Sequence, residues 1–183
     1  RFPHSQLFRD KIRRLNFNGT DTATILREYI SYQLYQDAGL PNLESGLARF
    51  HINGLETRGT PYRVWIENPD TQFLQRRDFF KAADGNLYKT TLDGTPNNKA
   101  TWRYVGENPN LYNLCYIKQN NEEEADYSDI IRFCRVLSQS DTWDDDYLEK
   151  VHSVINPDDF LRWMAVSACV AHWDSPFTDH GHN

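Results

Sequence analysis

The sequence predicts an α+β protein, and three features of it indicate this class. A strand at 11–18 and a helix after Gly19 open the chain, and alternating strands follow at 47–52 and 62–67. Helical patterns dominate the second half of the chain. Aromatic residues make up 14% of the 183 residues, which is enough to build a hydrophobic core and argues against disorder.

The first helix has clear start and stop signals. Gly19, Thr20 and Asp21 offer a short polar cap at its beginning, and Gly39 and Pro41 end it. Four apolar residues at helical spacing predict the face that packs on the core: Ala23, Leu26, Ile30 and Leu34.

Turn signals divide the middle of the chain. Asn53-Gly54 is expected to open the turn between the two strands, with Gly59 near its far end. Asp70 is expected to cap a short helix that ends near Arg77. Residues 87–89 predict a short strand. The stretch 91–122 is rich in Asn, Gly and Pro, which predicts that it is mostly loop.

Three helices are predicted near 124–139, near 141–152 and from Pro157 onward, the last capped by Asn156. Residues 160–171 are apolar on nearly all sides of that last helix, a pattern typical of a helix buried in a core. Cys134 and Cys169 lie in apolar helical patterns and are expected to be buried.

Composition excludes two classes of function. Acidic residues outnumber Lys and Arg by 26 to 20, giving a net charge of −6, and no basic stripe runs along any segment, so a nucleic-acid partner is not expected. No apolar run approaches the roughly 18 residues that a membrane-spanning helix needs. We therefore expect no membrane span in this sequence.

The polar segment after the last helix is the main candidate for chemistry. It carries Asp174, Asp179, His180, His182 and Asn183. In kinases an Asp orients the accepting hydroxyl and an Asn downstream of it binds Mg²⁺. The same side-chain types would also suit Zn²⁺ or Mn²⁺ in a hydrolase. A solvated loop without catalytic function is the third interpretation that the pattern leaves open.

Four stretches of the chain are similar to one protein family. The chain resembles the CotH family of spore-coat protein kinases, which have an atypical kinase fold. The similar stretches are LNFNGTDTATILREYISYQLYQDAGLP at 15–41, RFHINGLETRGTPYRVWIENPDTQFLQRR at 49–77, GNLYK at 85–89 and DDFLRWMAVSACVAHWDSPFTDHGHN at 158–183.

The resemblance implies a two-lobe kinase-like fold, with a small lobe at about 1–67 and a partial large lobe at about 68–183. The family has a second metal-binding Asp beyond its His-Asn pair, and this sequence stops at Asn183. We therefore expect a single CotH-like domain fragment, truncated before the end of the large lobe.

The resemblance also implies roles for individual residues. Asp174 would be the catalytic aspartate and Asn183 a metal-binding residue. Glu67, near a hinge-like position, and Lys89 would contact the ATP cofactor. Glu28 lies where a kinase has its lysine-pairing glutamate, but neither Asn16 nor Asn18 on the preceding strand is a lysine. For these two glutamates and for Lys89 the alternative is an ordinary ion pair.

The function implied by the resemblance is transfer of the γ-phosphate of ATP to Ser or Thr of a protein substrate, with Mg²⁺ as the metal. The substrate would be a spore-coat or surface protein, and the chain itself would lie in the spore coat or at the cell surface. The alternative is a non-catalytic coat or adhesion protein that keeps a degenerate kinase-like fold.

Overall fold

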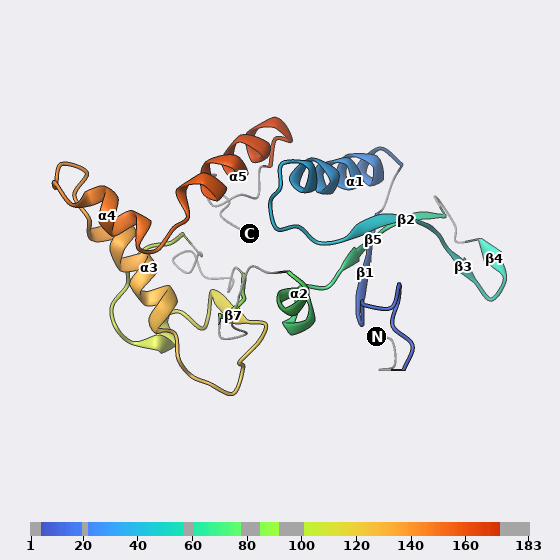
Figure 1. Ribbon diagram of the computed structural model, residues 1–183. Coiled ribbons are helices and arrows are strands. Elements are labelled where there is room, and N and C mark those ends of the chain that lie inside the picture. The colour runs from blue at the N-terminus through green and yellow to red at the C-terminus, as the bar shows by residue number, and fades with distance from the viewer. Residues whose placement is uncertain (1–4, 20–21, 57–60, 78–84, 92–100, 173–183) are drawn as a thin grey trace. The chain divides into compact units, whose positions relative to one another are not determined.

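Figure 1 shows a computed structural model of the protein, which describes residues 5–19, 22–56, 61–77, 85–91 and 101–172. The chain divides into two compact units, residues 1–85 and 86–183, and each unit is described here by itself. Helices and small antiparallel sheets occur in both units, which confirms the predicted α+β composition. The two-lobe kinase arrangement and the boundary after residue 67 stay predictions.

A three-stranded antiparallel sheet forms the centre of the first unit, in the order β1-β5-β2. Its strands are β1 (Leu15–Asn18), β5 (Tyr62–Glu67) and β2 (Ser45–Arg49). The last four residues of β5 are all buried, because side chains alternate across a strand and both faces of β5 are covered. Val64 and Ile66 belong to the cluster under the first helix, whereas the ring of Trp65 contacts Phe8 and Arg9.

Helix α1 (Thr22–Asp37) packs on this sheet through a different face from the one predicted. Ile25 is buried against Val64 and Ile66, and Tyr29 and Tyr32 pack against the same cluster. The predicted stripe is wrong in its described part, because half of each side chain is exposed: Leu26 49%, Ile30 52% and Leu34 42%. Tyrosine rings supply the buried area instead, and hydropathy patterns undervalue them because each ring carries a polar hydroxyl.

Asn53-Gly54 opens a turn as predicted, but this turn is the tip of a small hairpin with a strand at 55–56 that the sequence did not predict. It joins β3 (His51–Ile52) to β4 (Leu55–Glu56), and φ is positive at both turn residues. Two positive φ angles are what a two-residue hairpin turn requires, and Asn-Gly adopts them most easily. The predicted cap of the short helix is also confirmed, since Asp70 Oδ1 accepts from Gln72 N and Phe73 N at 3.0 and 3.3 Å. This helix is α2 (Thr71–Arg76).

The second unit contains the predicted short strand near 87–89, together with a partner strand and a core that the sequence did not predict. Strand β6 (Tyr88–Thr90) pairs with β7 (Tyr116–Lys118), and a 3₁₀ turn, η1 (Pro109–Leu111), lies between them in the chain. The core cluster joins five buried residues: Tyr112, Cys115, Tyr116, Ile131 and Cys134. Three of these five lie inside the stretch 91–122, which is mostly loop in its described part, as predicted, but contributes side chains to the core.

Buried tyrosine hydroxyls explain how such a polar stretch becomes ordered. The Tyr116 hydroxyl accepts from Trp102 N at 2.9 Å. The Tyr112 hydroxyl accepts from Val105 N and donates to Gly106 O, both at 3.1 Å. Burial raises the pKa of both phenols, so they remain neutral donors and acceptors. Backbone groups of the loop are thereby satisfied inside the unit, and no regular pairing is needed.

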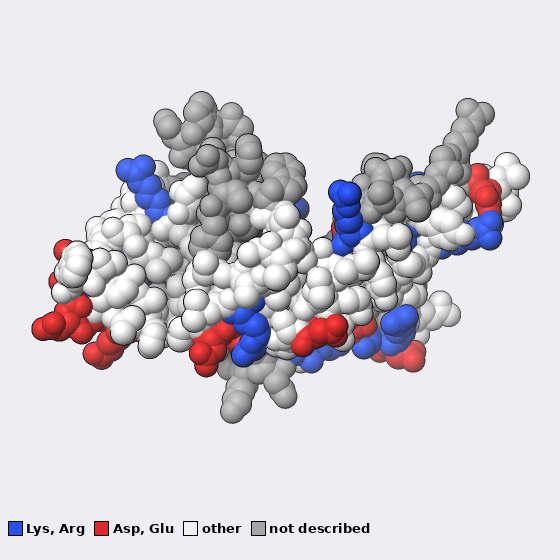
Figure 2. Space-filling model, turned by 90° about the horizontal axis from the view of Figure 1, so that it is seen from above, with Lys and Arg blue, Asp and Glu red and all other residues white. Residues whose placement is uncertain are grey.

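Two helices begin later than predicted, because aspartate turns come first. Asp126 Oδ1 accepts from Ser128 N at 2.8 Å, and α3 spans Ser128–Gln139. Asp141 Oδ1 accepts from Trp143 N at 3.0 Å, and α4 spans Tyr147–His152. Such side-chain turns compete with helix formation. The exposed acidic side chains around the start of α4 gather at the left of Figure 2, where Lys150 pairs with Asp144 and Asp146.

Helix α5 (Pro157–Cys169) has the predicted Asn156 cap, but it is not buried on all sides. Ser167 is its buried residue, and Leu161 is 62% exposed. The helix packs through one aromatic edge, where the Phe160 ring lies 6.2 Å from that of Trp102. The expectation for Cys169 was also wrong, since it is exposed, whereas Cys134 is buried as expected. An apolar sequence makes burial favourable, but it does not supply neighbours on every side.

The part of the chain that the structure describes holds no helix long and apolar enough to cross a bilayer.

The contact between Gly46 and Trp65 yields a stability prediction. A Cβ added to Gly46 would lie 2.5 Å from Trp65 Nε1, so Gly46→Ala should lower the free energy of unfolding by about 1–3 kcal/mol. Urea denaturation followed by circular dichroism measures this change. Adding Trp65→Phe, which removes the clashing atoms, should recover part of the loss. Equal unfolding midpoints for the wild type and Gly46→Ala would contradict the contact.

Two of the three cysteines, Cys134 and Cys169, should differ clearly in reactivity. Cys134 is fully buried, and burial raises the pKa of its thiol to about 11, so little reactive thiolate forms near neutral pH. Cys169 is exposed on α5. With iodoacetamide at pH 8, we expect Cys169 to be alkylated at least tenfold faster than Cys134 in the folded chain. A tenfold difference in rate corresponds to about 1.4 kcal/mol of activation free energy. Peptide mass spectrometry measures both alkylation rates. In urea, where the chain is unfolded, the two cysteines should react at similar rates, and this measurement is the control.

Candidate functional site

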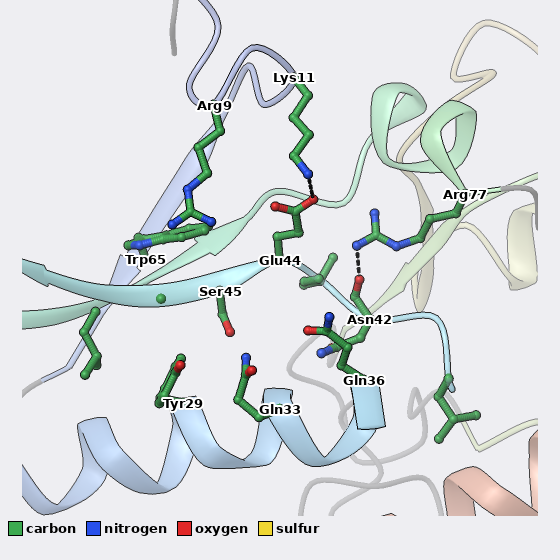
Figure 3. A pocket seen from close by; sticks show the side chains of 14 residues that line it. Arg9, Lys11, Tyr29, Gln33, Gln36, Asn42, Glu44, Ser45, Trp65 and Arg77 are labelled. Carbon is green, nitrogen blue, oxygen red and sulfur yellow. Dashed lines mark hydrogen bonds and ion pairs between the residues drawn. The ribbon is translucent and has the colours of Figure 1, made fainter. Parts of the chain in front are cut away.

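A cavity of about 630 Å³ in the first unit is the candidate functional site. We call it the α1–β2 cavity, because the second half of α1 and the chain leading into β2 form much of its wall (Figure 3). Its described lining residues come from the segment before β1, from these two elements, from β5 and from the end of α2: Arg9, Lys11, Tyr29, Gln33, Gln36, Leu40, Asn42, Leu43, Glu44, Ser45, Gly46, Leu47, Trp65 and Arg77.

Each cationic side chain of the α1–β2 cavity is held by a neighbour. Lys11 Nζ lies 2.5 Å from Glu44 Oε1. The Arg9 guanidinium lies 4.8 Å from the centre of the Trp65 ring, a cation–π contact. Trp65 in turn lies flat on β2, where its register partner is Gly46 and only a glycine leaves room for the indole. The cations are therefore placed by the sheet and by the segment that precedes it.

Beside the cavity, Glu67 forms a buried cluster with two arginines. Its carboxylate is 1% exposed, and it pairs with Arg76 and, at 3.2 Å, with Arg77. The backbone N–H of Glu44 donates to Glu67 Oε2 at 3.1 Å. Arg77 also donates to the Asn42 carbonyl and lies over the Phe73 ring at 4.3 Å. The cluster joins the end of β5 to the start of β2 and to α2.

Two arginines share this one carboxylate, so the cluster carries one positive charge in excess. Burial lowers the pKa of both guanidiniums, and for Arg76 the neighbouring Arg77 lowers it further. The negative charge of the Glu44 carboxylate raises the pKa of both guanidiniums. The local potential is therefore positive where Arg77 reaches the cavity wall.

The structure gives Glu67 the ion-pair arrangement that was the alternative to cofactor binding. Its carboxylate is engaged by two guanidiniums and a backbone N–H, and it is not among the described residues that line the cavity. A direct contact between this carboxylate and ATP would have to displace one of those partners. The cofactor role of Glu67 stays a prediction.

Glu28 on α1 is joined to the sheet through an amide. Asn18 Nδ2 on β1 donates to Glu28 Oε1 at 2.8 Å. The position is the one at which a kinase would place a lysine–glutamate pair between its strand and its helix. Here the link is a hydrogen bond to a neutral side chain, which orients the carboxylate but adds no positive charge.

Lys89 belongs to the second unit, where it is exposed on β6 opposite Ile117 of β7. Its strand is fixed to α3 by its neighbour, since the Tyr88 hydroxyl donates to Asp129 Oδ1 at 2.6 Å. Sequence reasoning missed Lys118, a buried cation whose Nζ donates to the Glu124 carbonyl at 3.0 Å. No sequence signal separates it from Lys89, because both are lysines on short strands. The phosphate role of Lys89 stays a prediction.

Asp174 and Asn183 lie outside the described residues, as do Asp179, His180 and His182. Their predicted catalytic and metal-binding roles stay predictions. Among the residues that are described, no group of three or more His, Cys, Asp and Glu side chains could hold a metal ion.

A comparison with family models decides the family. The model described as CotH kinase protein matches residues 4–183, nearly the whole sequence. The chain belongs to the CotH kinase family. Searches of curated proteins and of solved structures found no match. Membership in the CotH family confirms the resemblance seen in the sequence and identifies a kinase-like domain.

Sequence reasoning found the CotH motifs but missed the residues of the cavity. Arg9 and Lys11 precede the first strand, and Arg77 follows a short helix. Arg77 lies far from Arg9 and Lys11 in the chain, and only the packing of β1, β2 and α2 brings all three to the lining of the cavity. The signal that could have indicated this was the pair Gly46 and Trp65, which suggests close contact between two strands.

The Glu67 cluster yields a second stability prediction. Glu67→Gln removes the only carboxylate shared by two partly buried arginines, and breaking such a pair typically lowers the free energy of unfolding by about 3–5 kcal/mol. Glu44→Gln is the matched control, because its pair with Lys11 is more exposed and should change stability by less than about 1 kcal/mol. Urea denaturation measures both, and equal losses for the two variants would contradict the assigned importance of Glu67.

Proposed function

We propose that this chain is part of a protein kinase that transfers the γ-phosphate of ATP to Ser or Thr residues of a protein substrate. The observation that carries the proposal is the match of residues 4–183 to the CotH kinase family. The order strand, helix, strand, strand in the first unit supports it, because kinase small lobes contain a helix between sheet strands.

In this reaction, Asp174 orients the accepting hydroxyl and takes its proton. The hydroxyl oxygen forms a bond to the γ-phosphorus while the bond from that phosphorus to the leaving ADP oxygen breaks. Lys89 supplies a positive charge for the phosphates, and Glu67 belongs to the hinge that holds the nucleotide. These assignments follow the resemblance residue by residue.

Mg²⁺ is the metal that we propose, with Asn183 among its ligands. An amide oxygen together with the carboxylate of a neighbouring acidic residue is a donor set that suits Mg²⁺. When bound, the ion neutralises charge on the phosphates during transfer. We further propose that the substrate is a spore-coat or surface protein and that the chain lies in the spore coat or at the cell surface.

The catalytic assignment can be tested by phosphate transfer. Asp174→Asn keeps the size of the side chain but removes the proton acceptor, so transfer from γ-labelled ATP to protein should fall about 10²- to 10⁴-fold. The readout is the initial rate with Mg²⁺, using an acid-rich and a serine-rich protein as acceptors.

Asp145→Asn is the matched control, because this exposed aspartate on the loop before α4 has no assigned role. It should leave the transfer rate unchanged. Transfer at the wild-type rate after Asp174→Asn would contradict the role of Asp174. No transfer by the full-length wild-type protein in any assay would contradict the kinase proposal itself.

A non-catalytic coat or surface protein is the second candidate. The observation that favours it is the link between Asn18 and Glu28, which replaces the lysine–glutamate pair of active kinases with a neutral hydrogen bond. Calorimetric titration with ATP and Mg²⁺ separates the two candidates. Saturable heat supports the kinase, whereas no heat and no change in the melting temperature support the scaffold.

A further inference from the structure

The sequence contains two Asn-Gly pairs, and the fold places them in opposite surroundings. One is Asn53-Gly54, at the tip of the hairpin between β3 and β4, and the other is Asn18-Gly19, at the end of β1. An asparagine before a glycine is chemically special, because the glycine nitrogen can approach the side-chain amide carbon with no side chain in the way. Since the two pairs have the same sequence, only the structure distinguishes them.

The Asn53-Gly54 pair lies in open surroundings. All residues of the hairpin from 51 to 56 are exposed, and a Cβ added to Gly54 would meet no atom within 4 Å. The neighbouring apolar side chains give little support, since Ile52 is 60% exposed and Leu55 is 73% exposed. Water and base therefore reach the Asn53 amide and the Gly54 N–H.

The hairpin is also easy to open. Its described strands share two residue pairs, of which Ile52 with Leu55 lies next to the turn. The ion pair between Arg49 and Glu56 has both side chains about half exposed, and exposed pairs of this kind contribute little to stability. A two-stranded hairpin by itself is only marginally stable in water. The backbone rotation that brings the glycine nitrogen to the Asn53 side chain thus needs only a local opening.

The fold holds Asn18-Gly19 in place. Asn18 pairs with Val64 in the three-stranded sheet, and its Nδ2 donates to Glu28 Oε1 at 2.8 Å. Gly19 lies against the buried side chain of Ile25, because a Cβ at this glycine would be 2.7 Å from Ile25 Cγ1. Attack by the Gly19 nitrogen would require the sheet and the first helix to separate there. We therefore expect the folded chain to protect Asn18.

We propose that Asn53 is a site of spontaneous deamidation in the folded protein. The backbone nitrogen of Gly54 loses its proton to base and forms a bond to Cγ of Asn53. The bond from Cγ to Nδ2 breaks, and the departing amide nitrogen takes up a proton and leaves as ammonia. Water then opens the resulting succinimide ring at either carbonyl carbon, so the products at position 53 are aspartate and isoaspartate.

The conversion changes the hairpin tip in charge and in length. A neutral amide becomes a carboxylate, and isoaspartate adds one carbon to the backbone between positions 53 and 54. A two-residue turn joins its strands in one register, so the longer backbone weakens the pairing of Ile52 with Leu55. The reaction needs neither ATP nor Asp174, so it goes beyond the kinase proposal and does not depend on it.

The experiment is a time course of the complete chain in buffer at pH 8, followed by tryptic digestion and mass spectrometry. Trypsin releases the two pairs in separate peptides, 15–27 and 50–58. In the folded chain Asn53 should lose its amide about tenfold or more faster than Asn18, because the hairpin opens more readily than the sheet. In urea, where the fold protects neither pair, the rates should be similar. A rate for Asn53 no higher than that for Asn18 in the folded chain would overturn the proposal.

Two further results identify the chemical step. Isoaspartate must appear among the products, because direct hydrolysis of the amide by water gives aspartate alone. Gly54→Ala places a methyl group beside the attacking nitrogen and should slow the conversion of Asn53, while Asn18 in the same sample is the matched control. Because φ at Gly54 is +80°, the variant is compared with the wild type in urea, where the turn imposes no strain. Aspartate without isoaspartate, or an unchanged rate in the variant, would overturn the succinimide route.

Amide hydrogen exchange measures the effect on the hairpin. Residues 50–58 should exchange faster in the converted chain than in the fresh chain, because weaker strand pairing opens more often. Residues 15–27 are the control and should exchange alike in both samples. Equal exchange of residues 50–58 in the two samples would contradict the effect on strand pairing.

Discussion

The buried carboxylate of Glu67 is the interaction on which the first unit most depends. A carboxylate that is 1% exposed is tolerated only with charged and hydrogen-bonding partners, and here Arg76, Arg77 and the Glu44 backbone N–H supply them. Those partners come from α2 and from the chain that leads into β2, so one side chain at the end of β5 fixes how three elements meet.

Arg77 connects this junction with the α1–β2 cavity, since it is at once a partner of Glu67 and a residue of the cavity wall. Because two arginines share one carboxylate, the arrangement keeps excess positive charge close to the cavity.

The second unit is organised by tyrosines rather than by aliphatic residues. Tyr112 and Tyr116 are buried with their hydroxyls bonded to backbone groups of the stretch before them, which lets a segment rich in Asn, Gly and Pro pack as part of a core. The CotH family match covers this segment as well.

The sequence by itself determined the α+β class, the CotH family, the caps at Asp70 and Asn156, and the turn at Asn53-Gly54, because each depends on local chemistry or on a contiguous motif. It did not determine which face of α1 is buried, how exposed α5 is, or that Tyr112 and Tyr116 belong to a core. Those outcomes depend on which neighbours are present, and polar aromatic side chains can fill a core as well as aliphatic ones. The tertiary structure alone brought Arg9, Lys11 and Arg77 to one cavity and gave Glu67 its arginine partners, since residues so distant in the chain meet only when strands and helices pack.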